Sequence, residues 1–84
     1  MAKTNYSPTF PMFPGDAAAV TPSDSVNLAQ PSVVYIGGTG NVKVTTAQGT
    51  AVTFNGLPAG AVIPVQVLRV WSTGTTATNM VAIF

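Results

Sequence analysis

The sequence contains no cysteine and no histidine among its 84 residues. Without cysteine there is no disulfide bond and no thiolate nucleophile, and without histidine the commonest zinc and haem ligand is missing. The acidic residues are Asp16 and Asp24, and both lie in a proline-rich stretch. Carboxylate catalysis needs two acids held at a fixed separation on a rigid frame. We therefore expect no catalytic residues, no metal site and no cofactor, and hence no enzyme.

Charge is also scarce. Charged residues make up 6% of the chain and its net charge is +1, whereas an average domain has about 25% charged residues. This excludes the basic surface that nucleic-acid binding requires. No apolar run approaches the ~18 residues of a membrane helix, and the N-terminus has no secretory signal. We expect neither a nucleic acid nor a membrane as partner. A small, nearly neutral domain without disulfides is instead typical of a homo-oligomer.

Proline is concentrated near the N-terminus, since residues 1–31 hold five of the seven prolines. Proline lacks an N–H group and restrains the residue before it, so residues 1–22 are predicted to form an extended N-terminal arm. Asp16 to Val20 (DAAAV) could add one helical turn. Four large apolar side chains follow one another closely in this arm: Tyr6, Phe10, Met12 and Phe13. Such an arm lies on another protein surface or folds back on its own domain; on the first interpretation these four residues bind the partner protein.

Residues 23–84 read as a β domain. Short runs of β-branched and aromatic residues with apolar alternation predict strands at 32–36, 41–46, 50–54, 62–71 and 80–84. Residues 37–40 (GGTG) are interpreted as a hairpin turn, and Asn55-Gly56 as a tight turn. No segment has a sustained helical period. The predicted fold is all-β: a small antiparallel β-sandwich or barrel with an extended proline-rich N-terminal arm.

The strand at 62–71 is apolar on both faces. One face carries Ile63, Val65, Val67, Arg69 and Trp71; the other carries Val62, Pro64, Gln66, Leu68 and Val70. We assign the first face to the core and the second to an oligomer interface, because water should not cover it. The alternative is a closed barrel with a loop across the second face. Pro64 predicts an edge position or a bulge. Arg69 is a candidate for an interface ion pair, with Asp24 as one possible partner.

The pieces VNLAQP, VYIGGTGNVKVTT, VTF, LPAGAVIPVQVLRVWSTGTTAT and VAIF occur in this order between residues 23 and 84. This ordered set resembles small virion proteins of tailed bacteriophages and gene transfer agents, a group that includes head decoration (cement) proteins and spike-base proteins. The resemblance implies a β-rich, oligomeric protein on the outside of the phage head. It implies a partner in the major capsid protein and, for cement proteins, a homotrimer at three-fold positions. Residues 1–22 carry no part of the resemblance.

Three functions are consistent with these observations. The first is a non-enzymatic capsid decoration protein that stabilises contacts between major capsid subunits on the exterior of the virion. In this function the arm residues Tyr6, Phe10, Met12 and Phe13 bind the capsid. The second is the base of a head spike or fibre at five-fold vertices. The third, outside the resemblance, is a small glycan-binding β module that uses Trp71, Tyr35 and the loop at 72–79.

Overall fold

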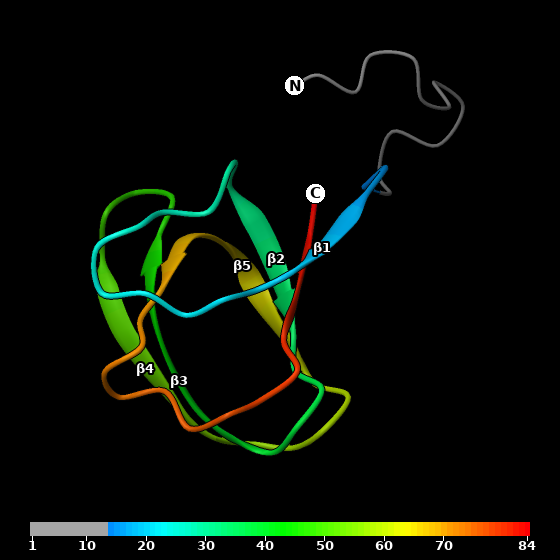
Figure 1. The fold of residues 1–84 in the computed structure, drawn as a ribbon, viewed down its shortest axis with the longest axis vertical. Coiled ribbons are helices and arrows are strands. Elements are labelled where there is room, and N and C mark those ends of the chain that lie inside the picture. The colour runs from blue at the N-terminus through cyan, green and yellow to red at the C-terminus, as the bar shows by residue number, and fades with distance from the viewer. Residues whose placement is uncertain (1–13) are drawn as a thin grey trace.

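The computed structural model describes residues 14–84. They form one antiparallel sheet of six strands that curls around the core but does not close (Figure 1). The strands are β1 (Ala17–Ala19), β2 (Ser32–Tyr35), β3 (Gly40–Thr46), β4 (Ala51–Leu57), β5 (Val62–Val70) and β6 (Val81–Ile83). Their order in the sheet is β1-β6-β2-β5-β3-β4. The predicted all-β antiparallel class is confirmed, and its form is a single open sheet. No helix in the described part of the chain is long and apolar enough to cross a membrane.

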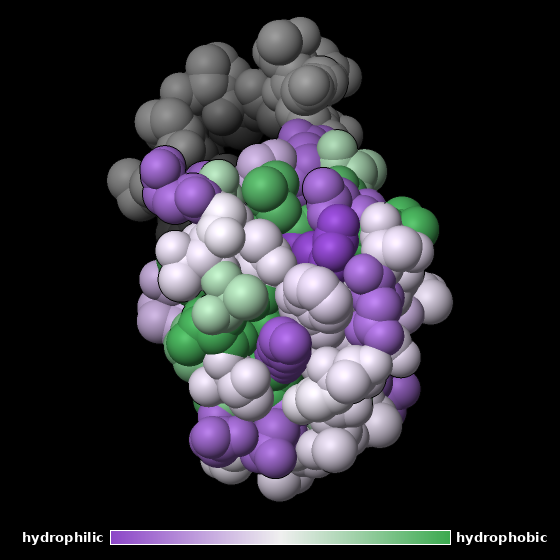
Figure 2. Space-filling view, turned by 90° about the vertical axis from the view of Figure 1, so that its left-hand side faces the viewer, coloured by the Kyte–Doolittle hydropathy of each residue, from purple (hydrophilic) through white to green (hydrophobic). Residues whose placement is uncertain are grey.

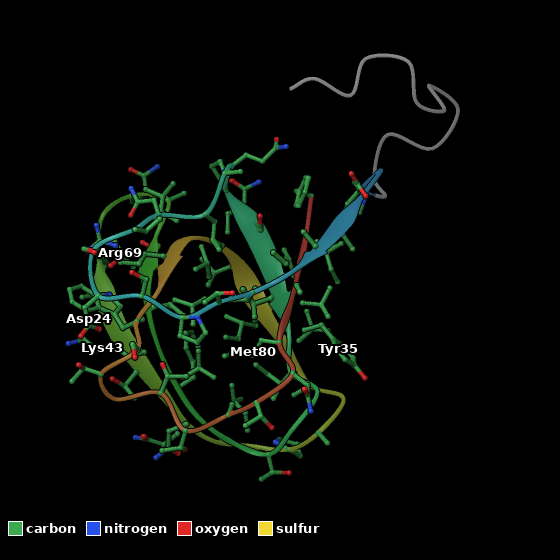
Figure 3. The ribbon with its side chains drawn as sticks, viewed as in Figure 1. Asp24, Tyr35, Lys43, Arg69 and Met80 are labelled. Atoms are coloured by element: carbon green, nitrogen blue, oxygen red, sulfur yellow. The ribbon has the colours of Figure 1, made fainter. Side chains whose placement is uncertain are left out.

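Alternation along the strands builds the core. Val42 and Val44 of β3 and Val34 of β2 are fully buried, whereas their neighbours in sequence are not. Because successive side chains of a strand point to opposite faces, one face of the curled sheet becomes the inside. The buried apolar cluster consists of Val34, Ile36, Val42, Val44, Ile63, Val67, Val70, Ala77 and Met80. Met80 points into this interior in Figure 3.

β5 is a central strand, between β2 and β3. Its pairing with β2 shifts register: Ser32 lies opposite Val67, but Val34, two residues on, lies opposite Ile63, four residues back. Pro64 falls within this irregularity. Proline has no N–H to offer a regular ladder, so the bulge places it where no such bond is required. Of the two positions predicted for Pro64, the bulge is confirmed and the edge is wrong.

Residues 36–39 connect β2 to β3, and these strands are not neighbours because β5 lies between them. The predicted hairpin is therefore wrong. The glycines serve a close approach instead: a Cβ on Gly38 would overlap the hydroxyl of Thr78, and a Cβ on Gly40 would overlap the backbone of Ala77. Gly38 and Thr78 also exchange two backbone hydrogen bonds, of 2.7 and 3.2 Å.

Asn55-Gly56 is not a tight turn, because β4 continues through it to Leu57. Gly56 has a φ of 67° and its N–H donates to Asn41 Oδ1 at 2.8 Å. The register between β3 and β4 shifts here. This is a β-bulge, another structure that needs a residue tolerant of positive φ. The hairpin that does occur joins β3 to β4 around Ala47–Gly49.

The segment from Asp16 to Val20 contains the strand β1 and no helical turn. β1 pairs with β6 through Ala17, Ala18 and Ala19. Backbone hydrogen bonds from Gly15 to Phe84 and from Phe84 to Asp16, of 3.1 and 2.8 Å, extend this pairing. Alanine's helix propensity is overridden here because the unpaired edge of β6 supplies backbone partners. The sequence analysis placed residues 14–22 in the extended arm. In the structure this segment contributes the strand β1 to the sheet.

Candidate interaction surfaces

The outer face of β1, β6, β2 and the start of β5 is apolar. The registers align two rows of side chains across it: Ala19, Val81, Tyr35 and Val62 in one row, and Ala17, Ile83 and Val33 in the other. Tyr35 is 38% exposed and Val62 is 47% exposed. With Pro64, which is exposed beyond Val62 on β5, these residues form a surface that we call patch A. None of them carries a charge.

Sequence reasoning found one strand of patch A and missed three. It assigned Val62, Pro64 and Gln66 to an oligomer interface, and in the single chain all three are exposed. The contributions of β1, β2 and β6 were not singled out. A signal was available, since SVVYI and MVAIF are nearly continuous apolar runs with little polar alternation. In an antiparallel sheet such a run indicates that both faces are covered.

Leu68 and Val70 are the other two residues predicted for the oligomer interface, and neither is exposed as the first three are. Leu68 is partly buried, and Val70 is buried in the chain's own core. The reason is a second register shift: Thr45 lies opposite Arg69 while Thr46 lies opposite Val67, so Leu68 is an extra residue. A bulge of one residue exchanges the faces of everything beyond it. Val70 therefore points inward, and Arg69 and Trp71 point outward.

A second apolar surface lies at the other end of the sheet, on β4. Val52 is opposite the buried Val44, so its side chain is on the core side of the sheet, yet it is 40% exposed. Phe54, opposite the buried Val42, packs partly against the core. Within residues 14–84, no strand pairs with the outer edge of β4. Because the sheet is not closed, the core is left partly open here. We call Val52 and Phe54 patch B; Figure 2 shows this side of the molecule, where apolar areas lie between polar ones.

Arg69 and Asp24, which the sequence analysis named as a possible ion pair, lie close together in the structure. The contact is a hydrogen bond from the guanidinium to the backbone carbonyl of Asp24. Arg69 donates from Nε to Asn27 Oδ1 at 2.8 Å, and from its terminal nitrogens to the carbonyl oxygens of Asp24 and Ser25 at 3.2 and 3.5 Å. These bonds fasten the segment before β2 to the outside of β5. Arg69, Asp24 and Lys43 lie together on this side of the molecule, away from Tyr35 (Figure 3).

The Asp24 carboxylate binds the loop after β5. It accepts hydrogen bonds from the hydroxyl and the backbone N–H of Thr73, at 2.5 and 2.8 Å. These bonds hold the pKa of Asp24 below its ordinary value of 3.8, and the bond from the Thr73 hydroxyl contributes most. Hydrogen bonds to the ionised form favour it. Asp24 therefore joins the segment before β2 to the loop after β5.

The Trp71 ring is covered by cations. Lys43 Nζ lies 4.5 Å and Arg69 Cζ 5.1 Å from the ring centroid, and the indole N–H donates to Thr45 Oγ1 at 2.9 Å. A sugar would have to displace these side chains before stacking on the ring. Tyr35, the other aromatic residue of the glycan hypothesis, lies on patch A. The structure does not bring the two together.

No three side chains of His, Cys, Asp or Glu come together within residues 14–84 as they would around a metal ion. The predicted capsid-binding residues of the arm (Tyr6, Phe10, Met12 and Phe13) lie outside the described residues. What residues 14–84 offer is two uncharged apolar surfaces on a small β fold. Exposed apolar surfaces of this kind are typical of sites that bind other proteins.

No protein-family model matches the chain, and no curated protein matches it. A solved structure does: the capsid of a native gene transfer agent (GTA) particle, computed with C5 symmetry. The identity is 35% over 84% of this chain and 83% of the matched chain, with a TM-score of 0.73. The chain belongs to the family of GTA virion proteins, and the matched chain is a component of that capsid particle.

Proposed function

We propose that the protein decorates the outside of the GTA head and stabilises contacts between major capsid subunits, as a cement protein does. Membership in the GTA virion family carries this proposal. Patches A and B support it, because exposed apolar surfaces of this kind are typical of proteins that bind other proteins. The side chains that could have served another purpose, Asp24 and Trp71, are engaged within the chain.

The protein acts by binding energy alone. Each large apolar side chain that becomes fully buried supplies about 1.5–3 kcal/mol. Many copies on one particle act together, so a weak contact per copy is sufficient. In this proposal the copies form a homotrimer at three-fold positions on the exterior. Tyr6, Phe10, Met12 and Phe13 would contact the major capsid protein; their sequence supports this role.

A second candidate function is the base of a head spike at five-fold vertices. What favours it is the resemblance of residues 23–84 to a group of virion proteins that includes spike-base proteins. The copies would then form a pentamer, and part of their surface would bind the spike.

The test uses particles from a strain that lacks this protein. Purified wild-type protein is added, free protein is removed by sedimentation, and the copies bound per particle are counted by quantitative mass spectrometry. Binding in numbers comparable with the major capsid protein supports the cement role. Binding limited to a few copies per vertex supports the spike base and contradicts cement. Absence of binding overturns both, and protection of bound protein from added protease would contradict the exterior position.

A further inference from the structure

We propose that Asn55 is a modification site, at which deamidation is slowed in the folded chain by the side chain of Asn41. The chain has one Asn-Gly pair, Asn55-Gly56, since the other asparagines precede Tyr6, Leu28, Val42 and Met80. Deamidation meets least steric hindrance in this pair, because glycine has no Cβ beside its nitrogen. Asn55 is also exposed on β4, so water reaches it.

The reaction begins at the backbone nitrogen of Gly56, which loses its proton to water and attacks the side-chain carbon Cγ of Asn55. A bond forms between this nitrogen and Cγ, and the bond from Cγ to Nδ2 breaks. Nδ2 takes up a proton from water and leaves as ammonia. Water then opens the resulting succinimide ring at either carbonyl and yields aspartate or isoaspartate. Water is thus the only co-reactant that the modification needs.

The folded chain opposes the first step, because the N–H of Gly56 donates to Oδ1 of Asn41 at 2.8 Å. Loss of the proton breaks this hydrogen bond and leaves a negative nitrogen facing the negative end of the Asn41 amide dipole. The Asn41 backbone is itself fixed. Its N–H donates to Thr76 Oγ1 at 2.9 Å, and its carbonyl oxygen accepts from the N–H groups of Thr76 and Ala77 at 2.8 and 3.1 Å. The acceptor is therefore held where the bond requires it.

The strand adds a second restraint. To attack, the peptide group between Asn55 and Gly56 has to rotate toward the Asn55 side chain. β3 pairs with the residues on either side of this peptide group, Phe54 and Leu57, and both side chains pack against the core. A segment held at both ends resists the rotation. An unfolded chain has neither restraint, so it should react faster than the folded one.

Either product would alter β4. Both place a carboxylate next to Phe54, which belongs to patch B. Isoaspartate also inserts a methylene into the main chain between Phe54 and Leu57, whose pairing with β3 fixes the register of this strand. By slowing the reaction, Asn41 preserves the edge strand of the sheet.

The test measures how fast Asn55 is converted in the free chain at mildly alkaline pH, so capsid binding does not enter. Proteolytic peptides are separated by chromatography, and electron-transfer fragmentation in the mass spectrometer distinguishes aspartate from isoaspartate. Wild-type protein unfolded in guanidinium chloride gives the rate without restraint. Asn41→Ala removes the acceptor, whereas Asn41→Asp keeps an acceptor oxygen. Gly49→Ala is the control for lost stability, because it strains a residue with a φ of 93° and leaves the Asn41 bond intact.

The hydrogen bond sets the expected difference. A net contribution of about 1 kcal/mol corresponds to about fivefold in rate. The folded wild type should therefore convert at least this much more slowly than the unfolded chain, and Asn41→Ala should convert faster than the wild type by about this factor. Asn41→Asp and Gly49→Ala should keep the wild-type rate.

Circular dichroism during the incubation shows that each variant is folded. If Asn41→Ala departs from the wild-type spectrum, Asn41→Val replaces it, since valine suits a strand and has no acceptor. The proposal is overturned if the folded wild type converts as fast as the unfolded chain, or if removal of the acceptor leaves the rate unchanged. It is equally overturned if Gly49→Ala or Asn41→Asp accelerates the reaction as much as Asn41→Ala does.

Discussion

Replacing Gly40 by alanine should destabilise the fold strongly. A Cβ at this position would overlap the backbone of Thr76 and Ala77, which cannot move aside as the end of a flexible side chain can. The contact is held by hydrogen bonds from the backbone N–H groups of Thr76 and Ala77 to the carbonyl oxygen of Asn41, at 2.8 and 3.1 Å. Asn41 N–H donates in return to Thr76 Oγ1 at 2.9 Å. The substitution pushes these partners apart.

The expected loss follows from these contacts. Overpacking costs about 1–3 kcal/mol, and each weakened hydrogen bond adds up to about 1 kcal/mol. A total of about 2–4 kcal/mol is a large part of the ~4–13 kcal/mol expected for a chain of this length. For a domain of this size it corresponds to a fall in melting temperature of roughly 10–30 °C.

Gly49→Ala provides the control for the loss of a glycine. Gly49 has a φ of 93° and nothing within 4 Å of an added Cβ, so this variant bears only backbone strain of about 1 kcal/mol. Thermal unfolding is followed by circular dichroism at one protein concentration, because the stability of an oligomer depends on concentration. A Gly40→Ala variant that melts within 2 °C (~0.5 kcal/mol) of the wild type, or above Gly49→Ala, would refute the reasoning.

Three further predictions concern the loops and the bulge. The lowered pKa of Asp24 means that its bonds to Thr73 stabilise the fold above pH 3.8 and that this contribution is lost as the pH falls further, through the folded-state pKa. Asp24→Asn should flatten this part of a plot of melting temperature against pH, and an unchanged slope would count against the assignment. Val70→Asp should unfold the chain, because it buries a charge in the core, whereas Leu68→Asp should remain folded; far-ultraviolet circular dichroism separates the two, and a folded Val70→Asp would show that the bulge is misplaced. Arg69→Lys should lower the stability to urea by about 1 kcal/mol, since lysine cannot make the forked bonds of the guanidinium, and an unchanged urea midpoint would contradict this.

The sequence predicted the strands of the domain well because their alternation is local. The five predicted strands at 32–84 all occur, with ends that differ by a few residues. β1 was missed because three alanines carry no strand signal, and it forms only where β6 offers an open edge. Such a partner is remote in sequence and cannot be read from the segment itself.

The glycines illustrate a second limit. The sequence analysis correctly predicted a residue with positive φ at Gly56. It could not distinguish a tight turn from a β-bulge, because both need positive φ. At Gly38 and Gly40 the requirement was space and not φ. The faces of β5 were assigned correctly up to Val67 and reversed after it, because a bulge of one residue leaves no mark in the apolar pattern.

The stability of the particles tests the central claim most directly. Particles with and without the protein are heated in steps, and intact heads are counted by electron microscopy at each step. If the protein is a cement, heads that lack it should break at a lower temperature, and added wild-type protein should restore the original temperature. If heads with and without the protein break at the same temperature, the protein does not stabilise the contacts between capsid subunits and the proposed function is wrong.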